Sequence, residues 1–361
     1  MTRIVLHIGP EKCGSTSIQQ AMARDGADHQ FLLLDPYLVI GLDHEEPDPN
    51  VIAQLRRQIA ALLTDAPGKT LIVSHEMVFK SQDMLREMAA ICTAVSQDVR
   101  AVMYVRRPSD FAMSGFGQWH FRTPERVTQA RRVLEDHGID ARVFSGVERH
   151  LLAGLLGGWT VFRQPSGHLY VNWHKSVAQA QKTLAAHQVM LHVGTLPRKG
   201  FDGDLIADFR QRAGLAPSDA PDLVQIRNPG FSPAVIEATV NAIEAGHAMP
   251  GPHEANDFYG SAGELALEPV LDDGFLTVLK AHVDVAFWEE NQTFAKAFGH
   301  PAAYFAPDLD VSECSLDDSI IACEMRRGKA GRAGLALAAQ QRADRLNAAW
   351  RARGSARYAQ D

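Results

Sequence analysis

The chain has 361 residues, with 36 Lys and Arg against 43 Asp and Glu, a formal net charge of −7, and 46% hydrophobic residues. This composition excludes a mostly disordered chain, and the length suffices for two domains or one large α/β domain. The four cysteines form no CxxC pair, so neither a disulfide framework nor a zinc cluster is predicted. The negative net charge argues against a nucleic-acid partner.

Apolar runs give no sign of a membrane protein. The longest uncharged apolar stretch, 151–162, is shorter than a bilayer requires. The first apolar run, after Arg3, is too short for the core of a signal peptide. We therefore expect a soluble, cytoplasmic protein without a membrane span.

Strand and helix patterns alternate through the first part of the chain. Apolar, β-branched runs predict strands at 3–8, 31–34, 70–74, 99–105 and 189–193. Helical spacing predicts helices at 15–22, 51–63, 84–95 and 204–213. This alternation predicts an α/β fold, with a central parallel sheet covered by helices on both faces. Ligands bind such sheets beyond the carboxyl ends of the strands.

The remainder is predicted to be mainly helical. Helices are expected within 111–159 and at 232–246, 276–299 and 330–353, with a Pro- and Asp-rich linker at 216–229. Residues 325–361 contain nine Lys and Arg against two Asp and Glu, a net charge of +7. This tail is a solvated helix face, a segment that docks on the acidic remainder of the same or a partner chain, or an attractor of a polyanionic glycan. Docking on a partner chain would give a homo-oligomer through the C-terminal helix.

The loop after the first strand has the spacing of a phosphate-binding loop. Gly9 and Gly14 are placed as in a Walker A loop, between a strand and a helix. Ser15 stands where that motif has its lysine, and the loop's only lysine is Lys12. The backbone amides of 13–17 and the helix dipole still favour a bound phosphate. The strand at 70–74 is followed by a histidine and a glutamate, with no clear aspartate to hold magnesium.

The segment HIGPEKCGSTSIQ resembles the 5′-phosphosulfate loop of sulfotransferases that use 3′-phosphoadenosine 5′-phosphosulfate (PAPS), similar to P-K-[ST]-G-[ST]-[ST]. That family also has an arginine after a later strand and a serine eight residues on, as Arg106 and Ser114 are spaced here. The resemblance implies a P-loop-like three-layer α/β/α fold with additional C-terminal helices, PAPS as donor and no metal. It implies that the donor's phosphates contact Lys12, Cys13, Gly14, Ser15, Thr16, Ser17, Arg106 and Ser114.

The resemblance extends over residues 2–305. The segment 203–215 is similar to the G-D-L-x-x-D-F-x-x-x-x-G-L stretch of bacterial sulfotransferase-like proteins, and Asn291 with Phe294 and Phe298 resembles their closing helix. This implies a sulfotransferase-like α/β domain at 1–305 and an extension with a basic helical tail at 306–361. Cys13 departs from the family's Ser or Thr, and Arg198-Lys199-Gly200 resembles an R-K-G that the family has near its C-terminus.

The implied reaction transfers a sulfuryl group to a hydroxyl or amine of a carbohydrate, a glycolipid or a small alcohol. Lys12 would stabilise the departing phosphate, and a base beyond the third strand would take the acceptor's proton. Either Glu76 or His75 fits that role, and alternation along a strand allows only one of them to face the donor.

Other interpretations stay open. The chain could be an atypical P-loop kinase or nucleotide hydrolase, or a sulfotransferase-like module that binds without turnover. Cys13 is either passive or a thiol of lowered pKa. Arg106 could instead pair with Asp110, and Arg107 is expected to be the solvated arginine of the two. His7 is expected to be structural. The following two residues are expected on the helix after Ser114, as core or as acceptor-pocket lining: Trp119 and His120.

Overall fold

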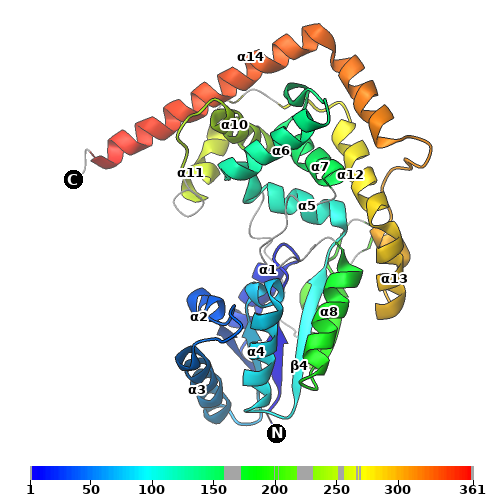
Figure 1. The fold of residues 1–361 in the computed structure, drawn as a ribbon. Helices are drawn as coiled ribbons and strands as arrows, with labels where there is room; N and C mark the ends of the chain where they lie inside the picture. The colour runs from blue at the N-terminus through cyan, green and yellow to red at the C-terminus, as the bar shows by residue number, and fades with distance from the viewer. Residues whose placement is uncertain are drawn as a thin grey trace. The chain divides into compact units, whose positions relative to one another are not determined.

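Figure 1 shows the computed structural model, which describes residues 2–157, 172–198, 200–201, 203–217, 231–250, 256–265, 267 and 270–358. The chain forms two compact units. The first contains Met1–Arg107, Gln164–Asn228 and Glu289–Tyr304, and the second contains the remaining segments, Pro108–Arg163, Pro229–Trp288 and Phe305–Asp361. The division at residue 305 that the family resemblance implies stays a prediction.

The first unit is built on a five-stranded parallel sheet. Its strands are β1 (Ile4–His7), β2 (His29–Leu33), β3 (Thr70–Ser74), β4 (Val99–Val105) and β5 (Met190–Thr195). Their order across the sheet is β2-β3-β1-β4-β5, and all four pairings are parallel. The carboxyl ends of β1 and β3 are adjacent, because His7 is in register with Ser74. The predicted α/β class with a central parallel sheet is confirmed.

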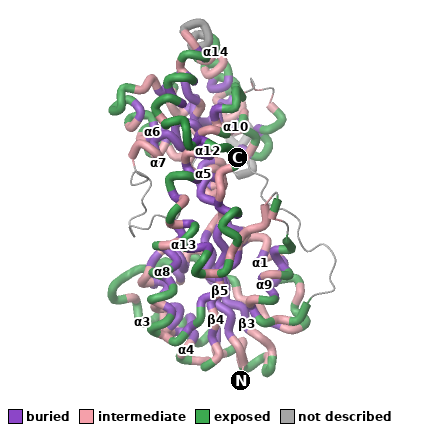
Figure 2. The backbone as a smooth tube through the Cα atoms, turned by 90° about the vertical axis from the view of Figure 1, so that its right-hand side faces the viewer, coloured by how far each residue is buried: buried purple, intermediate pink, exposed green. Residues whose placement is uncertain are grey.

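Helices cover both faces of this sheet. The first unit contains α1 (Ser15–Arg24), α2 (Pro36–Ile40), α3 (Pro49–Asp65), η1 (Glu76–Lys80), α4 (Gln82–Thr93), α8 (Trp173–Ala185), α9 (Leu205–Ala213), nearly all of α13 (Trp288–Phe298) and most of η6 (Ala302–Phe305). Helices α1 and α9 pack together, and α4 packs with α3 and α8. Figure 2 shows these two groups on opposite sides of the strands. The result is the three-layer α/β/α arrangement predicted from the alternating pattern.

The G-D-L segment has a structural explanation in α9. Asp204 caps this helix, since its carboxylate accepts hydrogen bonds from the backbone amides of residues 206 and 207. Asp208 accepts a 2.6 Å hydrogen bond from the Tyr104 hydroxyl and two from the Arg212 guanidinium. Gly214 ends the helix in the left-handed conformation, φ 69°. These contacts attach α9 to β4 and make the segment part of the sheet's support.

The second unit is helical in the part of it that the structure describes. Its helices are α5 (Pro108–Phe116), η2 (His120–Arg122), α6 (Pro124–Asp136), η3 (Ala141–Val143), α7 (Gly146–Leu156), α10 (Pro233–Glu244), α11 (Asn256–Ser261), η5 (Ala262–Glu264), α12 (Phe275–Ala286) and α14 (Leu316–Tyr358). Phe116, Phe121, Phe258 and Tyr259 form its aromatic core, to which α14 adds the buried Leu346. Asp284 of α12 caps α5, because its two carboxylate oxygens accept from the Ser109 amide and hydroxyl.

Several predicted boundaries are wrong. The helix expected at 276–299 is two helices, α12 and α13, which are separated at Phe287. Trp119 and His120 follow the end of α5 rather than lying on it. Most of the expected linker at 216–229 lies outside the described residues. Within those that are described, no helix combines the length and apolar character needed to cross a membrane.

The tail is more than a solvated helix face, because two of its arginines are buried within the second unit. Arg327 donates to both Glu148 oxygens at 2.8 and 2.9 Å, to both Asp273 oxygens at 2.9 and 3.0 Å, and to the Val143 carbonyl at 2.7 Å. Arg342 donates to the side-chain oxygen of Asn241 at 3.1 Å. These two arginines therefore fit the interpretation in which the tail docks on its own chain.

Candidate active site

The loop between β1 and α1 depends on three residues with positive φ. Gly9, Lys12 and Gly14 have φ values of 87°, 64° and 88°. Gly14 is the N-cap of α1, and no side chain that the structure describes caps this end of the helix. The amides of the first helical turn therefore keep their capacity to bind an acceptor from outside, at the positive end of the helix dipole.

The hydroxyl-bearing residues of the loop differ in their exposure. The Ser15 hydroxyl is buried and donates to the Pro10 carbonyl at 2.9 Å, which closes the loop on itself. Thr16 and Ser17 are half-buried, as is Lys12. Five consecutive residues of the predicted phosphate site span the end of the loop and the first turn of α1: Cys13, Gly14, Ser15, Thr16 and Ser17.

Cys13 is buried, and its surroundings disfavour the thiolate form. Burial raises the pKa of its thiol to about 12, an effect larger than the opposing attraction of the Arg106 and Lys12 charges. The alternative of a low-pKa thiol at this helix N-terminus is therefore wrong, because desolvation disfavours the thiolate more than nearby cations favour it. The burial of Cys13 within the loop favours the passive role.

Glu76 follows β3 and lies directly against the loop. A Cβ atom on Gly9 would be 2.7 Å from the Glu76 Cα, so only glycine allows this close approach. Glu11 of the loop also forms an ion pair with Lys80 of η1. The loop and the segment after β3 are thus held together at the carboxyl end of the sheet.

The Glu76 carboxylate is held by a partly buried chain of hydrogen bonds. Gln19 of α1 donates from its amide nitrogen to Glu76 Oε2 at 2.9 Å and to Ser74 Oγ at 3.2 Å. The same Ser74 hydroxyl lies 2.8 Å from Nδ1 of His7, which is fully buried. Burial alone would raise the pKa of Glu76, but the hydrogen bond from Gln19, a backbone hydrogen bond and the histidine charges lower it overall. Glu76 is accordingly ionised at neutral pH.

His75 is committed to capping the helix η1. Its Nδ1 accepts a hydrogen bond from the Met77 amide at 3.1 Å, so the neutral ring carries its proton on Nε2. Burial lowers the pKa of His75 more than the Glu76 charge raises it. Because β3 ends at Ser74, the alternation rule that opposed His75 to Glu76 does not apply to these two residues.

Two arginines, Arg106 and Arg107, follow β4, and the exposure of Arg107 differs from the prediction. Arg106 is half-buried, and its Nη1 donates to the Lys12 carbonyl at 3.3 Å. The buried Trp173 holds the Arg106 carbonyl through a 2.5 Å hydrogen bond from its indole nitrogen. Arg107, expected to be solvated, is only 3% exposed. Asp110, the alternative partner of Arg106, forms an ion pair with Lys280 at 3.1 Å.

The predicted site residues are divided between the units. Residues 12–17, His75, Glu76 and Arg106 belong to the first unit, where contacts connect the loop to Glu76 and to Arg106. Ser114 lies half-buried on α5 of the second unit. Its pairing with Arg106 stays a prediction.

The sequence patterns did not point to Gln19 or Ser74. The available signal was weak: Gln19 is one helical turn beyond Ser15 and so shares its face, which adjoins the loop. Ser74 ends the third predicted strand, and its register with His7 depends on a strand order that the sequence does not contain. Among the described residues, no cluster of three or more His, Cys, Asp or Glu side chains could hold a metal ion.

Comparisons with known proteins give a structural similarity alone. No protein-family model matches the chain, and no curated protein does. Among solved structures, the chain is similar to a sulfotransferase from Alicyclobacillus acidocaldarius, with 11% identity and a TM-score of 0.41. The similarity covers 84% of this chain and 99% of that one. At this identity and TM-score the similarity assigns no role to any individual residue. Residue roles can come only from the geometry of the site itself.

Proposed function

We propose that the chain is a sulfotransferase that moves a sulfuryl group from PAPS to a hydroxyl or amine acceptor. The observation that carries the proposal is the contact between the loop 9–14 and Glu76. A helix N-terminus that no described side chain caps, with a lysine beside it, and an ionised carboxylate meet at one end of a parallel sheet. Sulfuryl transfer requires this pair of functions, since negative charge develops on the leaving phosphate while the acceptor loses a proton.

The donor's 5′-phosphosulfate is assigned to the first turn of α1. The uncapped amides of Ser15, Thr16 and Ser17 suit an anion, and Lys12 adds a positive charge to the same loop. Arg106 is assigned to the donor's 3′-phosphate, with Ser114 as its partner. The hydrogen bond from Arg106 to the Lys12 carbonyl supports this division, because it connects the two cationic residues.

Glu76 is the better candidate for the base. In the proposed step, the acceptor oxygen or nitrogen forms a bond to sulfur as the bond from sulfur to the bridging phosphate oxygen breaks. The acceptor's proton passes to the Glu76 carboxylate, and the electron pair stays on 3′,5′-ADP, where Lys12 and the loop amides stabilise it. His75 suits the role less well, because the Met77 amide already occupies the Nδ1 lone pair.

The acceptor is proposed as a class: a carbohydrate, a glycolipid or a small alcohol. The test is an assay of 3′,5′-ADP release from PAPS in the presence of each acceptor type, with ATP and magnesium as the alternative donor. We expect acceptor-dependent release from PAPS and no phosphoryl transfer from ATP. Phosphoryl transfer from ATP would support the kinase interpretation instead. Binding of PAPS without release to any acceptor would indicate a module without turnover.

A further inference from the structure

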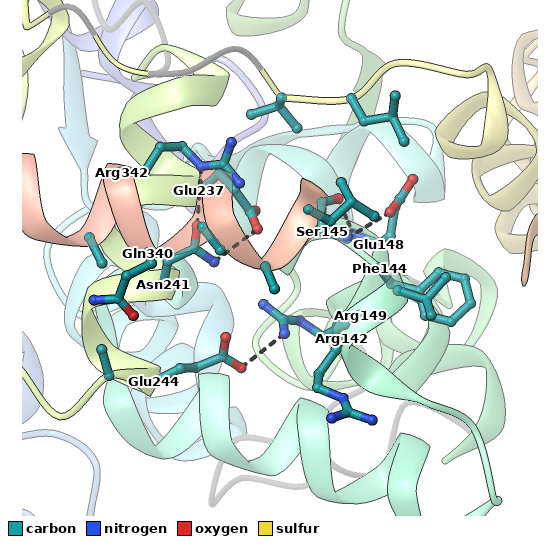
Figure 3. A pocket seen from close by; sticks show the side chains of 18 of the residues that line it. Arg142, Phe144, Ser145, Glu148, Arg149, Glu237, Asn241, Glu244, Gln340 and Arg342 are labelled. Carbon is teal, nitrogen blue, oxygen red and sulfur yellow. Dashed lines mark hydrogen bonds and ion pairs between the residues drawn. The ribbon is translucent and has the colours of Figure 1, made fainter. Parts of the chain in front are cut away.

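The cavity beside α7, α10 and α14 in the second unit gives no indication of a ligand. It has a volume of about 270 Å³, and charged side chains line it. These side chains bond to one another, because Arg149 pairs with Glu244 at 2.9 Å and Asn241 connects Glu237 to Arg342 (Figure 3). The polar groups of this cavity thus serve the packing of the second unit.

Helix α1 of the first unit, by contrast, carries groups for two parts of the proposed reaction. Its first turn, 15–17, which no described side chain caps, is assigned to the phosphosulfate of PAPS. Gln19 lies one turn further along and donates a hydrogen bond to Glu76, the proposed base. A helix is rigid over this distance, because backbone hydrogen bonds hold each turn. One element therefore sets the spacing between PAPS and the base.

The Gln19 amide has only one orientation that suits Glu76. Its Nε2 lies 2.9 Å from Glu76 Oε2 and 3.2 Å from Ser74 Oγ. An ionised carboxylate can only accept hydrogen bonds, so the amide nitrogen, and not the amide oxygen, must face Glu76. That nitrogen carries two protons, one for each of these two oxygens. Both N–H groups of the side chain are thus used at the base.

The other end of this chain of hydrogen bonds lies inside the sheet. Ser74 is fully buried, and the register of β3 and β1 pairs it with His7. The Ser74 hydroxyl accepts from Gln19 and lies 2.8 Å from His7 Nδ1, so its own proton can be donated to that nitrogen. Burial lowers the pKa of His7 to about 4, so the ring is neutral at pH 7 and can accept this hydrogen bond. Gln19 is therefore held against two strands of the sheet rather than against the loop.

The hydrogen bond from Gln19 also affects the charge of the base. Burial is the largest influence on the pKa of Glu76 and raises it, and the Gln19 hydrogen bond is the strongest of the influences that lower it. Two histidines, His75 and His7, also act on Glu76, but burial lowers the pKa of both, so the two rings are neutral at pH 7. Loss of the Gln19 hydrogen bond would therefore favour the protonated form of Glu76.

Packing alone does not require this arrangement. A half-buried side chain on α1 could fill its space without directing an N–H group at a carboxylate. On the basis of the proposed function, we propose that Gln19 is a positioning residue that holds the Glu76 carboxylate at a fixed place relative to the PAPS-binding turn of α1. Gln19 acts through Glu76, so its loss affects proton removal and leaves PAPS binding intact.

Titration of Glu76 in the full-length protein tests the proposal without any turnover. The probe is the side-chain carboxyl ¹³C signal of protein labelled with ¹³C-carboxyl glutamate, and Glu76→Gln identifies the signal by its loss. Gln19→Met retains the length of the side chain but removes the N–H groups, so the pKa of Glu76 should rise. Gln19→Glu places a second carboxylate against the first and should raise it further.

The same variants should separate kcat from KM in the PAPS assay. Gln19→Met should lower kcat roughly tenfold or more, as expected for loss of one hydrogen bond to a charged group, while KM for PAPS stays close to that of the unchanged protein. The acid limb of its pH profile should move to higher pH. The matched control is Gln20→Met, because Gln20 is also half-buried on α1 but forms no side-chain hydrogen bond with any described residue. It should match the unchanged protein in every measurement.

An unchanged Glu76 pKa in folded Gln19→Met would overturn the proposal, and so would an equal rise in Gln20→Met. Urea unfolding shows whether each variant is folded, and Gln19→Glu carries the test if Gln19→Met is not. Lower stability with an unchanged Glu76 pKa would give Gln19 a purely structural role and contradict the proposal. If the unchanged protein releases no 3′,5′-ADP from PAPS with any acceptor, the proposed function fails, whereas the titration still decides whether Gln19 holds Glu76.

Discussion

Glu76 is the residue on which the proposed chemistry depends most. Three side chains fix its position and charge: Gln19 donates to it, Ser74 shares that donor, and His7 holds Ser74. His75, one residue earlier, has a structural task at the start of η1. The distinction arises because β3 ends before both residues, a detail that the run TLIVSHE does not determine.

Substituting Glu76 and His75 one at a time separates their roles. Glu76→Gln retains the size and the contact with Gln19 but removes the basic carboxylate, so we expect the transfer rate to fall by about 10²–10⁴ while 3′,5′-ADP binding persists. His75→Asn retains a capping oxygen and should stay close to the unchanged rate. Because the pKa of Glu76 is lowered, the rate should decline on the acid side only below the usual carboxyl range. Loss of turnover in His75→Asn alone would contradict the assignment.

Cysteine labelling tests the passive role of Cys13. Its thiol is buried with a pKa raised to about 12 by desolvation, so little thiolate exists near pH 8. Cys314 is exposed in the same chain and provides an internal control. With iodoacetamide on the native protein, mass spectrometry should find Cys314 modified well before Cys13. Equal rates at the two thiols would show that Cys13 is reactive after all.

At the scale of elements, the conformation of the loop at 9–14 depends on close packing as well as on positive φ. Gly9 and Gly68 have nearly equal φ values, 87° and 86°, but only Gly9 lies against another segment. Gly68→Ala should cost about 1–2 kcal/mol from backbone strain alone. Gly9→Ala adds a clash with the Glu76 backbone and should also abolish 3′,5′-ADP binding. Binding retained in folded Gly9→Ala would show that the loop tolerates displacement from Glu76.

The segment α14, whose helix is interrupted at Gly328, is anchored by Arg327. Its guanidinium is bonded to Glu148 and Asp273, and the side chains of Arg327 and Glu148 are each only 4% exposed. Arg327→Met would leave the Glu148 charge buried without its partner, at a cost of about 3–5 kcal/mol in the free energy of unfolding. Arg326 is exposed, so Arg326→Met should change it by less than about 0.5 kcal/mol. Equal urea midpoints for the two variants would mean that the network contributes nothing.

Sequence patterns were sufficient to predict the strands and most of the helices. They were insufficient to predict the tertiary contacts between these elements. The strands 70–74 and 99–105 match their predicted limits because a run of β-branched and apolar residues ends at a polar one. The break at Phe287 and the burial of Arg107 depend on tertiary contacts, so local propensity could not indicate them. The loop at 9–14 could be predicted because its glycine spacing is local, whereas the contact of Ser74 with His7 depends on the strand order of the sheet.

At the scale of the whole molecule, charge is distributed unevenly. The net charge of −7 combines a tail of +7 with an acidic remainder of −14. Part of the tail's charge is internal, since Arg327 and Arg342 are bonded within the second unit. The cationic residues Lys12 and Arg106 are then a local exception in an acidic chain. This arrangement favours one small polyanion at one place over broad binding to polyanions.

Calorimetry tests the central claim most directly, by comparing 3′,5′-ADP with ATP and magnesium as ligands of the full-length protein. We predict micromolar binding of 3′,5′-ADP, much weaker binding of Mg-ATP, and loss of 3′,5′-ADP binding in Lys12→Ala or Arg106→Ala. Gln82→Ala, at the start of α4 and outside the loop, serves as the control and should bind normally. Preference for Mg-ATP, or 3′,5′-ADP binding that neither substitution weakens, would contradict the account.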